Sequence, residues 1–168
     1  IRVAPRMLHL LADRPIVLTR FPNGVDKEGF YEKDAPEGAP SWVKTVRIYS
    51  ETAKRNVNYI LCNDLDTLIW LADLAAIEIH MPLSTVDARQ KPDFVLFDID
   101  PEPPADIEDA THVALLLKEK LDLLGFESYV KTTGKKGLHV VLPVVPNYTF
   151  KQTRAFVHQM GKLLAKES

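Results

Sequence analysis

The sequence predicts an α+β fold, in which a mixed or antiparallel central sheet is flanked by helices. Two observations support this prediction. Segments that alternate apolar and polar side chains stand among segments with apolar residues at helical spacing, so strands and helices are interspersed along the chain. Several of the expected strands are joined by short turns, which connect antiparallel neighbours, whereas parallel strands need long crossovers.

The first half of the chain is expected to hold two helices among its strands. Residues 3–14 place apolar side chains on one side of a helix, and Asp64 and Asp66 open a second, capped helix over 64–75. The expected strands share an alternating or β-branched pattern, and Pro, Gly or polar turns separate them. These strands are 15–21, 28–33, 43–50, 57–62 and 76–81.

The second half begins with the clearest strand, 93–100, which ends where Pro101, Pro103 and Pro104 remove ladder donors. The segments that follow alternate helix and hairpin: a helix over 104–125 with Gly125 as its stop, strands at 126–133 and 138–144 joined by a tight turn, and a helix over 148–168.

Composition limits the possible functions. The net charge is −2, so nucleic acid would have to bind through local patches and not through a global positive field. No apolar run reaches the ~20 residues of a membrane helix, and the single cysteine, Cys62, excludes an internal disulfide. We therefore expect one cytoplasmic domain over 1–168, without a membrane partner.

Two carboxylates stand at the end of the 93–100 strand. Asp98 and Asp100 are two residues apart, so their side chains point to the same face of the strand. Mg²⁺ typically takes one or two carboxylates and fills its shell with water and substrate phosphate oxygens. The pair predicts a divalent-metal site, although two solvated Asp side chains at a strand end remain the alternative.

A glycine-rich turn precedes the 138–144 strand. Thr133, Gly134 and Gly137 form a turn whose backbone can run close to a ligand, and its N–H groups can form an anion nest. Lys135 and Lys136 add positive charge, and His139 lies on the next strand. The pattern indicates a phosphate-binding turn, with an ordinary Lys-Gly hairpin as the alternative.

Two further groups in the first half could contact a nucleotide. Glu78 and His80 share one face of the 76–81 strand. Phe30 and Tyr31 place aromatic rings beside Lys33, and aromatic faces stack on nucleobases while a lysine can take a phosphate. A structural histidine and ordinary core aromatics are the alternatives.

In this order, the motifs resemble the polymerase domain of ATP-dependent ligase D and its stand-alone archaeal versions, in the archaeo-eukaryotic primase superfamily. The likeness covers nearly the whole chain. The matching segments are VAPRMLHLLADRPIVLTRFPNGV, GFYEK, LIWLADLAAIEIHMPLS, DFVLFDIDP and KTTGKKGLHVVLPV.

The resemblance implies a template-directed nucleotidyltransferase that prefers ribonucleotides and acts at DNA breaks or gaps in non-homologous end joining. It implies that Asp98 and Asp100 are catalytic metal ligands for Mn²⁺ or Mg²⁺. The residues it assigns to the nucleotide are Phe30, Tyr31, Lys33, His80, Thr133, Gly134, Gly137 and His139.

The resemblance also implies parts beyond this span. The family has a third metal Asp on a later strand and lysines upstream that hold a DNA 5′-phosphate, so we expect the chain to be a truncated catalytic core. The implied partners are gapped DNA or DNA ends with a template, nucleoside triphosphates, an end-joining ligase and the Ku end-binding protein, in a prokaryotic cytoplasm at the nucleoid.

Two alternatives stay open. A non-catalytic module that binds DNA ends or nucleotides is the first, and the residues expected to contact nucleic acid are Lys54, Arg55, Lys135 and Lys136. A phosphatase of the haloacid-dehalogenase type also has a strand ending in D-x-D. That class usually has Thr or Val two residues after the second Asp, where this chain has Glu102.

Overall fold

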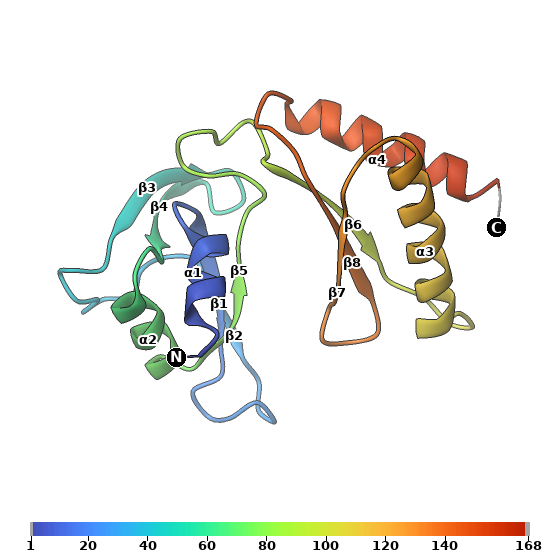
Figure 1. The fold of residues 1–168 in the computed structure, drawn as a ribbon. Helices are drawn as coiled ribbons and strands as arrows, with labels where there is room; N and C mark the ends of the chain where they lie inside the picture. Colours follow the sequence, from blue (N-terminus) through green and yellow to red (C-terminus); the bar gives the residue numbers. More distant parts are fainter. Residues whose placement is uncertain (1, 167–168) are drawn as a thin grey trace. The chain divides into compact units, whose positions relative to one another are not determined.

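The computed structural model describes residues 2–166 and divides the chain into two compact units, Ile1–Asp87 and Ala88–Ser168 (Figure 1). The α+β class is confirmed, because helices and strands are interspersed along the chain. The strand pairs are antiparallel, and the described strands form two sheets, not one central sheet. The expectation of a single domain over 1–168 stays a prediction.

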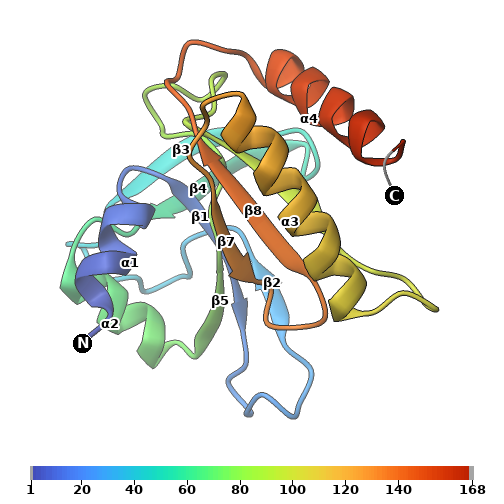
Figure 2. The same ribbon diagram turned by 45° about the vertical axis from the view of Figure 1, so that its right-hand side comes forward.

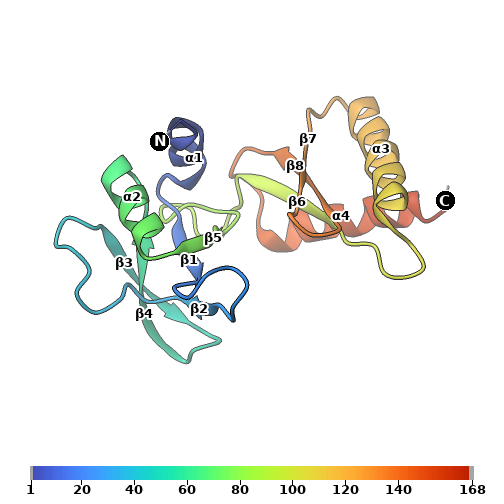
Figure 3. The same ribbon diagram turned by 90° about the horizontal axis from the view of Figure 1, so that it is seen from below.

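The first unit is a sheet with two helices packed on it. Its sheet has the order β2-β1-β4-β3, and β5 also pairs with β1. Side chains from α1 and α2 meet strand residues such as Ile16, Leu18 and Ile60 in one core, and Figure 3 shows both helices on the same side of β3 and β4. The elements are α1 (Ala4–Leu11), β1 (Pro15–Arg20), β2 (Phe30–Glu32), β3 (Thr45–Ser50), β4 (Arg55–Leu61), α2 (Leu65–Asp73) and β5 (Ala76–His80).

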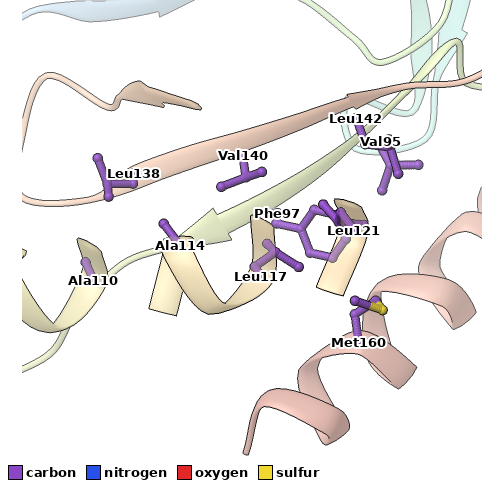
Figure 4. Close-up of a cluster of buried hydrophobic side chains, with 10 residues drawn as sticks. All are labelled: Val95, Phe97, Ala110, Ala114, Leu117, Leu121, Leu138, Val140, Leu142 and Met160. Carbon is purple, nitrogen blue, oxygen red and sulfur yellow. The ribbon is translucent and has the colours of Figure 1, made fainter. Parts of the chain in front are cut away.

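The second unit is a three-stranded sheet in the order β6-β8-β7, with helices α3 and α4. Figure 2 shows α3 running along β8, and Figure 4 shows side chains of β6 and β8 directed toward α3 and α4. The elements are β6 (Phe94–Ile99), α3 (Ile107–Leu123), β7 (Tyr129–Thr132), β8 (Leu138–Pro143) and α4 (Phe150–Leu164).

Cap residues define the helix boundaries; the caps at Asp64 and Gly125 were predicted, whereas the one at Asp106 was not. Asp64 accepts a hydrogen bond from the Thr67 N–H at 2.8 Å, and Asp106 forms a capping box at the start of α3. Gly125 follows α3 with φ +77°, the left-handed conformation expected of a helix stop. The last helix is shorter than the predicted 148–168, and residues 167–168 lie outside the described part.

Alternation along β6 and β8 divides their side chains between two faces. Val95 and Phe97 of β6 and Val140 and Leu142 of β8 are buried against α3 and α4. Because successive side chains of a strand point to opposite faces, Asp98 and His139 lie on the face away from these helices. The hydrophobic core therefore determines which face of the sheet carries the polar motif residues.

Burial raises the pKa of the Cys62 thiol to about 11, so this side chain stays protonated at neutral pH and is no candidate nucleophile. Over residues 2–166, every helix is too short or too polar to cross a membrane.

We expect the Leu121→Ala substitution to lower the free energy of unfolding of the second unit by about 3 kcal/mol, because it leaves a cavity in the core. Leu121 is 0% exposed, whereas Leu123 of the same helix is 75% exposed. The measurement is urea denaturation followed by circular dichroism, with Leu123→Ala as the matched control. Equal destabilisation by the two variants would contradict this account of the core.

Candidate functional site

In the second unit, one cross-strand row carries a carboxylate, an imidazole and an ammonium group. Asp98 of β6 lies opposite His139 of β8, and His139 lies opposite Lys131 of β7. Residues directly opposite each other on antiparallel strands point to the same face. All three side chains therefore lie on the face away from α3 and α4.

Both carboxylates of the predicted metal site are accessible to solvent. Asp98 has a side-chain exposure of 64%, and its Oδ1 lies 3.4 Å from Nε2 of His139, which is 24% exposed. Asp100 follows the last residue of β6, and its side chain is also exposed. The pair therefore has oxygen atoms that a cation can reach without crossing the core.

The turn that joins β7 to β8 is closed by the Thr133 hydroxyl. Its Oγ1 donates to the Gly137 carbonyl at 3.1 Å and accepts from the N–H groups of Gly137 at 3.2 Å and Lys135 at 3.4 Å. Two of the N–H groups expected in an anion nest are thus directed at Thr133. A ligand at this turn would have to bind the remaining N–H groups or replace these bonds.

Gly137 brings the turn against the end of β6. A Cβ atom at this position would lie 2.7 Å from the Ile99 carbonyl oxygen and 3.3 Å from Oδ1 of Asp100. Because the first of these atoms belongs to the backbone, it cannot move aside as a flexible side chain would. The absence of a side chain at Gly137 therefore lets the turn lie directly beside Asp100.

The donor set of this unit fits a divalent cation only in part. Asp98 and Asp100 supply the carboxylate oxygens that Mn²⁺ and Mg²⁺ prefer. Within residues 2–166, the structure holds no group of three or more His, Cys, Asp or Glu side chains placed to bind a metal. Such an ion would need further oxygen ligands from water, from a substrate phosphate or from another protein segment.

In the first unit, a second polar row surrounds Thr19 of β1. Thr19 lies opposite Tyr31 of β2 and opposite Glu78 of β5. Its Oγ1 is 2.8 Å from Nε2 of His80, and the same nitrogen is 3.5 Å from Oε2 of Glu78. The ring centroids of Tyr31 and His80 are 5.3 Å apart. The structure therefore places Tyr31 and His80 side by side.

The two predicted aromatic residues do not share a face. Phe30 lies opposite Arg20 of β1, whose guanidinium is 5.1 Å from the centroid of the Phe30 ring. Arg20 also bonds Glu32 at 2.9 Å. Because Phe30 and Tyr31 are consecutive in β2, only Tyr31 points to the face that carries His80. Phe30 is thus separated from the other predicted nucleotide contacts.

Lys33 completes the group around Tyr31. Its Nζ is 6.0 Å from the centroid of the Tyr31 ring and donates to Oγ1 of Thr52 at 2.7 Å. Thr52 lies in the turn of the β3–β4 hairpin and contacts the nearly buried Ser50 hydroxyl at 3.1 Å. The Lys33 ammonium is therefore held beside the ring by a hydrogen bond to the hairpin.

The four residues predicted to contact nucleic acid differ in their pairing. Arg55 forms an ion pair with Asp34, and this bond, with help from the Asn58 N–H, lowers the pKa of the Asp34 carboxyl. The side chain of Lys54, in the turn of the β3–β4 hairpin, is exposed, as are Lys135 and Lys136 in the other turn. The lysines are thus better placed than Arg55 to meet a phosphate.

Sequence reasoning missed Thr19, Thr52 and Lys131. Thr19 had a local signal, because it is a polar residue in the largely apolar segment 15–20. Thr52 had none, because its contact with Lys33 joins two separate loops of the chain. Lys131 was visible as a residue of the predicted strand, but its place opposite His139 depends on the β7–β8 register.

Known proteins share this sequence pattern. The family described as LigD, primase-polymerase domain, matches residues 1–168. The bifunctional non-homologous end joining protein LigD of Bacillus subtilis is 34% identical over 163 residues, which are 96% of this chain and 26% of that protein. The multifunctional non-homologous end joining protein LigD of Mycolicibacterium smegmatis is 32% identical over 144 residues, which are 84% of this chain and 19% of that protein.

A solved structure shares the fold. The polymerase domain of Mycobacterium tuberculosis ligase D, in complex with DNA, matches with a TM-score of 0.87 and 25% identity, over 98% of this chain and 60% of that chain. This chain spans about a quarter or less of the length of the two LigD relatives named above. The resemblance expected from the motifs is confirmed, and the chain belongs to the LigD primase-polymerase domain family.

Proposed function

We propose that this chain is the nucleotide-transferring part of an end-joining polymerase, which adds ribonucleotides to a primer 3′-hydroxyl opposite a template. The observation that carries the proposal is the β6 end, where Asp98 and Asp100 lie beside the turn closed by Thr133. The family match and the non-homologous end joining relatives support it.

Asp98 and Asp100 would hold Mn²⁺ or Mg²⁺ in a two-metal site completed by a third carboxylate from outside this span. Bound ions of this kind lower the pKa of an attacking hydroxyl and neutralise charge on the triphosphate and the leaving pyrophosphate. The two side chains contribute negative oxygens at an exposed strand end, and His139 lies next to Asp98. We assign no protein general base.

The remaining residues would bind and orient the nucleotide. The Thr133 turn and His139 lie where a triphosphate could approach the carboxylates of the second unit. In the first unit, the exposed Tyr31 ring offers a stacking face, and His80 and Lys33 stand beside it. Positioning and electrostatics supply most of the catalysis in phosphoryl transfer, so these groups need no covalent role.

We further propose that Lys54, Lys135 and Lys136 contact the DNA backbone. Because the net charge is −2, the chain as a whole does not attract DNA. The attraction must come from local positive groups such as these lysines. The solved relative in complex with DNA supports a DNA partner. Gapped DNA with a template and nucleoside triphosphates would be the substrates, with an end-joining ligase and Ku as partners at the bacterial nucleoid.

A binding module without catalysis is the second candidate. It is favoured by one observation, namely that residues 2–166 hold no group of three or more potential metal ligands. Such a module would bind nucleotide or DNA ends and leave the carboxylates silent. The family match gives no support to the phosphatase alternative.

We expect Asp98→Asn and Asp100→Asn each to reduce templated extension by about 100-fold or more, the scale of loss when a group that stabilises transition-state charge is removed. The assay is primer extension on a gapped, 5′-phosphorylated duplex with Mn²⁺ and ribonucleotides. Asp122→Asn is the control, because it removes only an exposed ion pair with Lys118 on α3. Metal-dependent nucleotide binding without any extension by the wild-type chain would indicate an incomplete catalytic core that needs the third carboxylate from outside this span.

We expect Gly137→Ala to weaken metal-dependent nucleotide binding by about tenfold or more, because its Cβ would push the turn away from Ile99 and Asp100. The measurement is titration with a fluorescent ribonucleoside triphosphate in Mn²⁺. Gly161→Ala is the matched control, since a Cβ there meets nothing within 4 Å. Unchanged affinity in the Gly137→Ala variant would separate this turn from the nucleotide site.

We expect Lys54→Gln, Lys135→Gln and Lys136→Gln to weaken DNA binding and to flatten its salt dependence. Removing one lysine that binds a phosphate should reduce the slope of log K against log salt by about 0.9 on duplex DNA. Fluorescence anisotropy at several salt concentrations measures the slope. Lys118→Gln, at an exposed lysine paired with Asp122, is the control and should leave the slope unchanged.

A further inference from the structure

We propose that Thr19 and Thr52 are positioning residues, whose hydroxyl groups hold His80 and Lys33 beside Tyr31 in place for a nucleoside triphosphate. This inference rests on the proposed function, because it concerns the same ligand. It adds two residues, from β1 and the β3–β4 turn, to which the sequence analysis assigned no role.

Thr19 holds His80 through one ring nitrogen. Its Oγ1 lies 2.8 Å from Nε2, and Oε2 of Glu78 approaches the same nitrogen at 3.5 Å. Both contacts come from side chains on the sheet face, so they fix the ring from its Nε2 edge. These contacts use Nε2, and 44% of the His80 side chain remains exposed for a ligand. Loss of the Thr19 hydroxyl would free the ring to rotate.

Thr52 holds Lys33 in a comparable way. A lysine side chain has high rotamer entropy, and fixing its end before a ligand arrives reduces the ordering cost of binding. The 2.7 Å bond from Lys33 Nζ to Thr52 Oγ1 provides this restraint. Thr52 is itself in contact with Ser50, which is 7% exposed, so the restraint is anchored in the hairpin.

The two restrained side chains, His80 and Lys33, lie beside the same ring, that of Tyr31. The residue is 58% exposed, and its ring lies 5.3 Å from the His80 ring and 6.0 Å from Lys33 Nζ. An aromatic face flanked by an imidazole and an ammonium group suits a ligand with a flat base and an anionic tail. Both hydroxyls thus act on the ligand through their neighbours and do not touch the reacting atoms.

The test replaces each hydroxyl by a methyl group of the same shape. We expect Thr19→Val and Thr52→Val each to raise the dissociation constant for a fluorescent ribonucleoside triphosphate in Mn²⁺ by about tenfold. The double variant should lose about 100-fold if the two restraints act independently. Thr19→Ser and Thr52→Ser keep the hydroxyl and should bind within about twofold of the wild-type chain.

The controls separate positioning from general damage. Thr111→Val removes a hydroxyl that bonds its own helix at Ile107, and it should change nothing. Duplex DNA affinity and the unfolding midpoint should stay at wild-type values in every variant. Unchanged nucleotide affinity in both Val variants would overturn the inference, and so would equal losses in the Ser and Val variants. In either case metal-dependent binding by the wild-type chain would leave the proposed function standing, whereas no such binding would overturn both.

Discussion

The antiparallel pairing of β6 with β8 is the interaction on which the candidate site depends. It places Asp98 opposite His139 and brings the end of β6 to the turn before β8. A register shift of one residue would turn every side chain of a strand to the opposite face, so the polar motifs and the core are set together. Phe97 and Val140, packed against α3 and α4, hold this register because they are buried. Burial of apolar side chains on one face of the sheet thus fixes the positions of Asp98 and His139 on the other face.

Exposure explains why two carboxylates are tolerated at this strand end. Asp98 keeps most of its side chain in solvent, where hydration offsets the repulsion from Asp100. A buried pair would need a partner at all times, whereas an exposed pair is stable before a cation and a phosphate bind. The absence of a side chain at Gly137 lets the backbone turn lie close to Asp100, at this same exposed strand end.

The first unit separates core and ligand faces by the same rule. Leu18 and Ile79 are opposite each other on the core side of β1 and β5, while Thr19 lies opposite Glu78 on the other side. The face that carries Thr19 gathers side chains from three strands and from the hairpin turn that holds Thr52. A set of weak polar contacts can therefore be ordered on a surface whose position is determined by hydrophobic burial beneath it.

Local patterns in the sequence by themselves determined the α+β class, the approximate bounds of the helices and strands, and the residues of the motifs. Alternation, helix caps and prolines act over a few residues, so their effects are visible in the chain itself. Asp64 at the start of α2 and Gly125 after α3 were predicted for this reason. Tertiary structure alone decided that the strands form two sheets, that Tyr31 and not Phe30 faces His80, and that Thr19 and Thr52 contact His80 and Lys33. These outcomes depend on which strands pair and in what register, and pairing between distant segments is set by burial of the whole core.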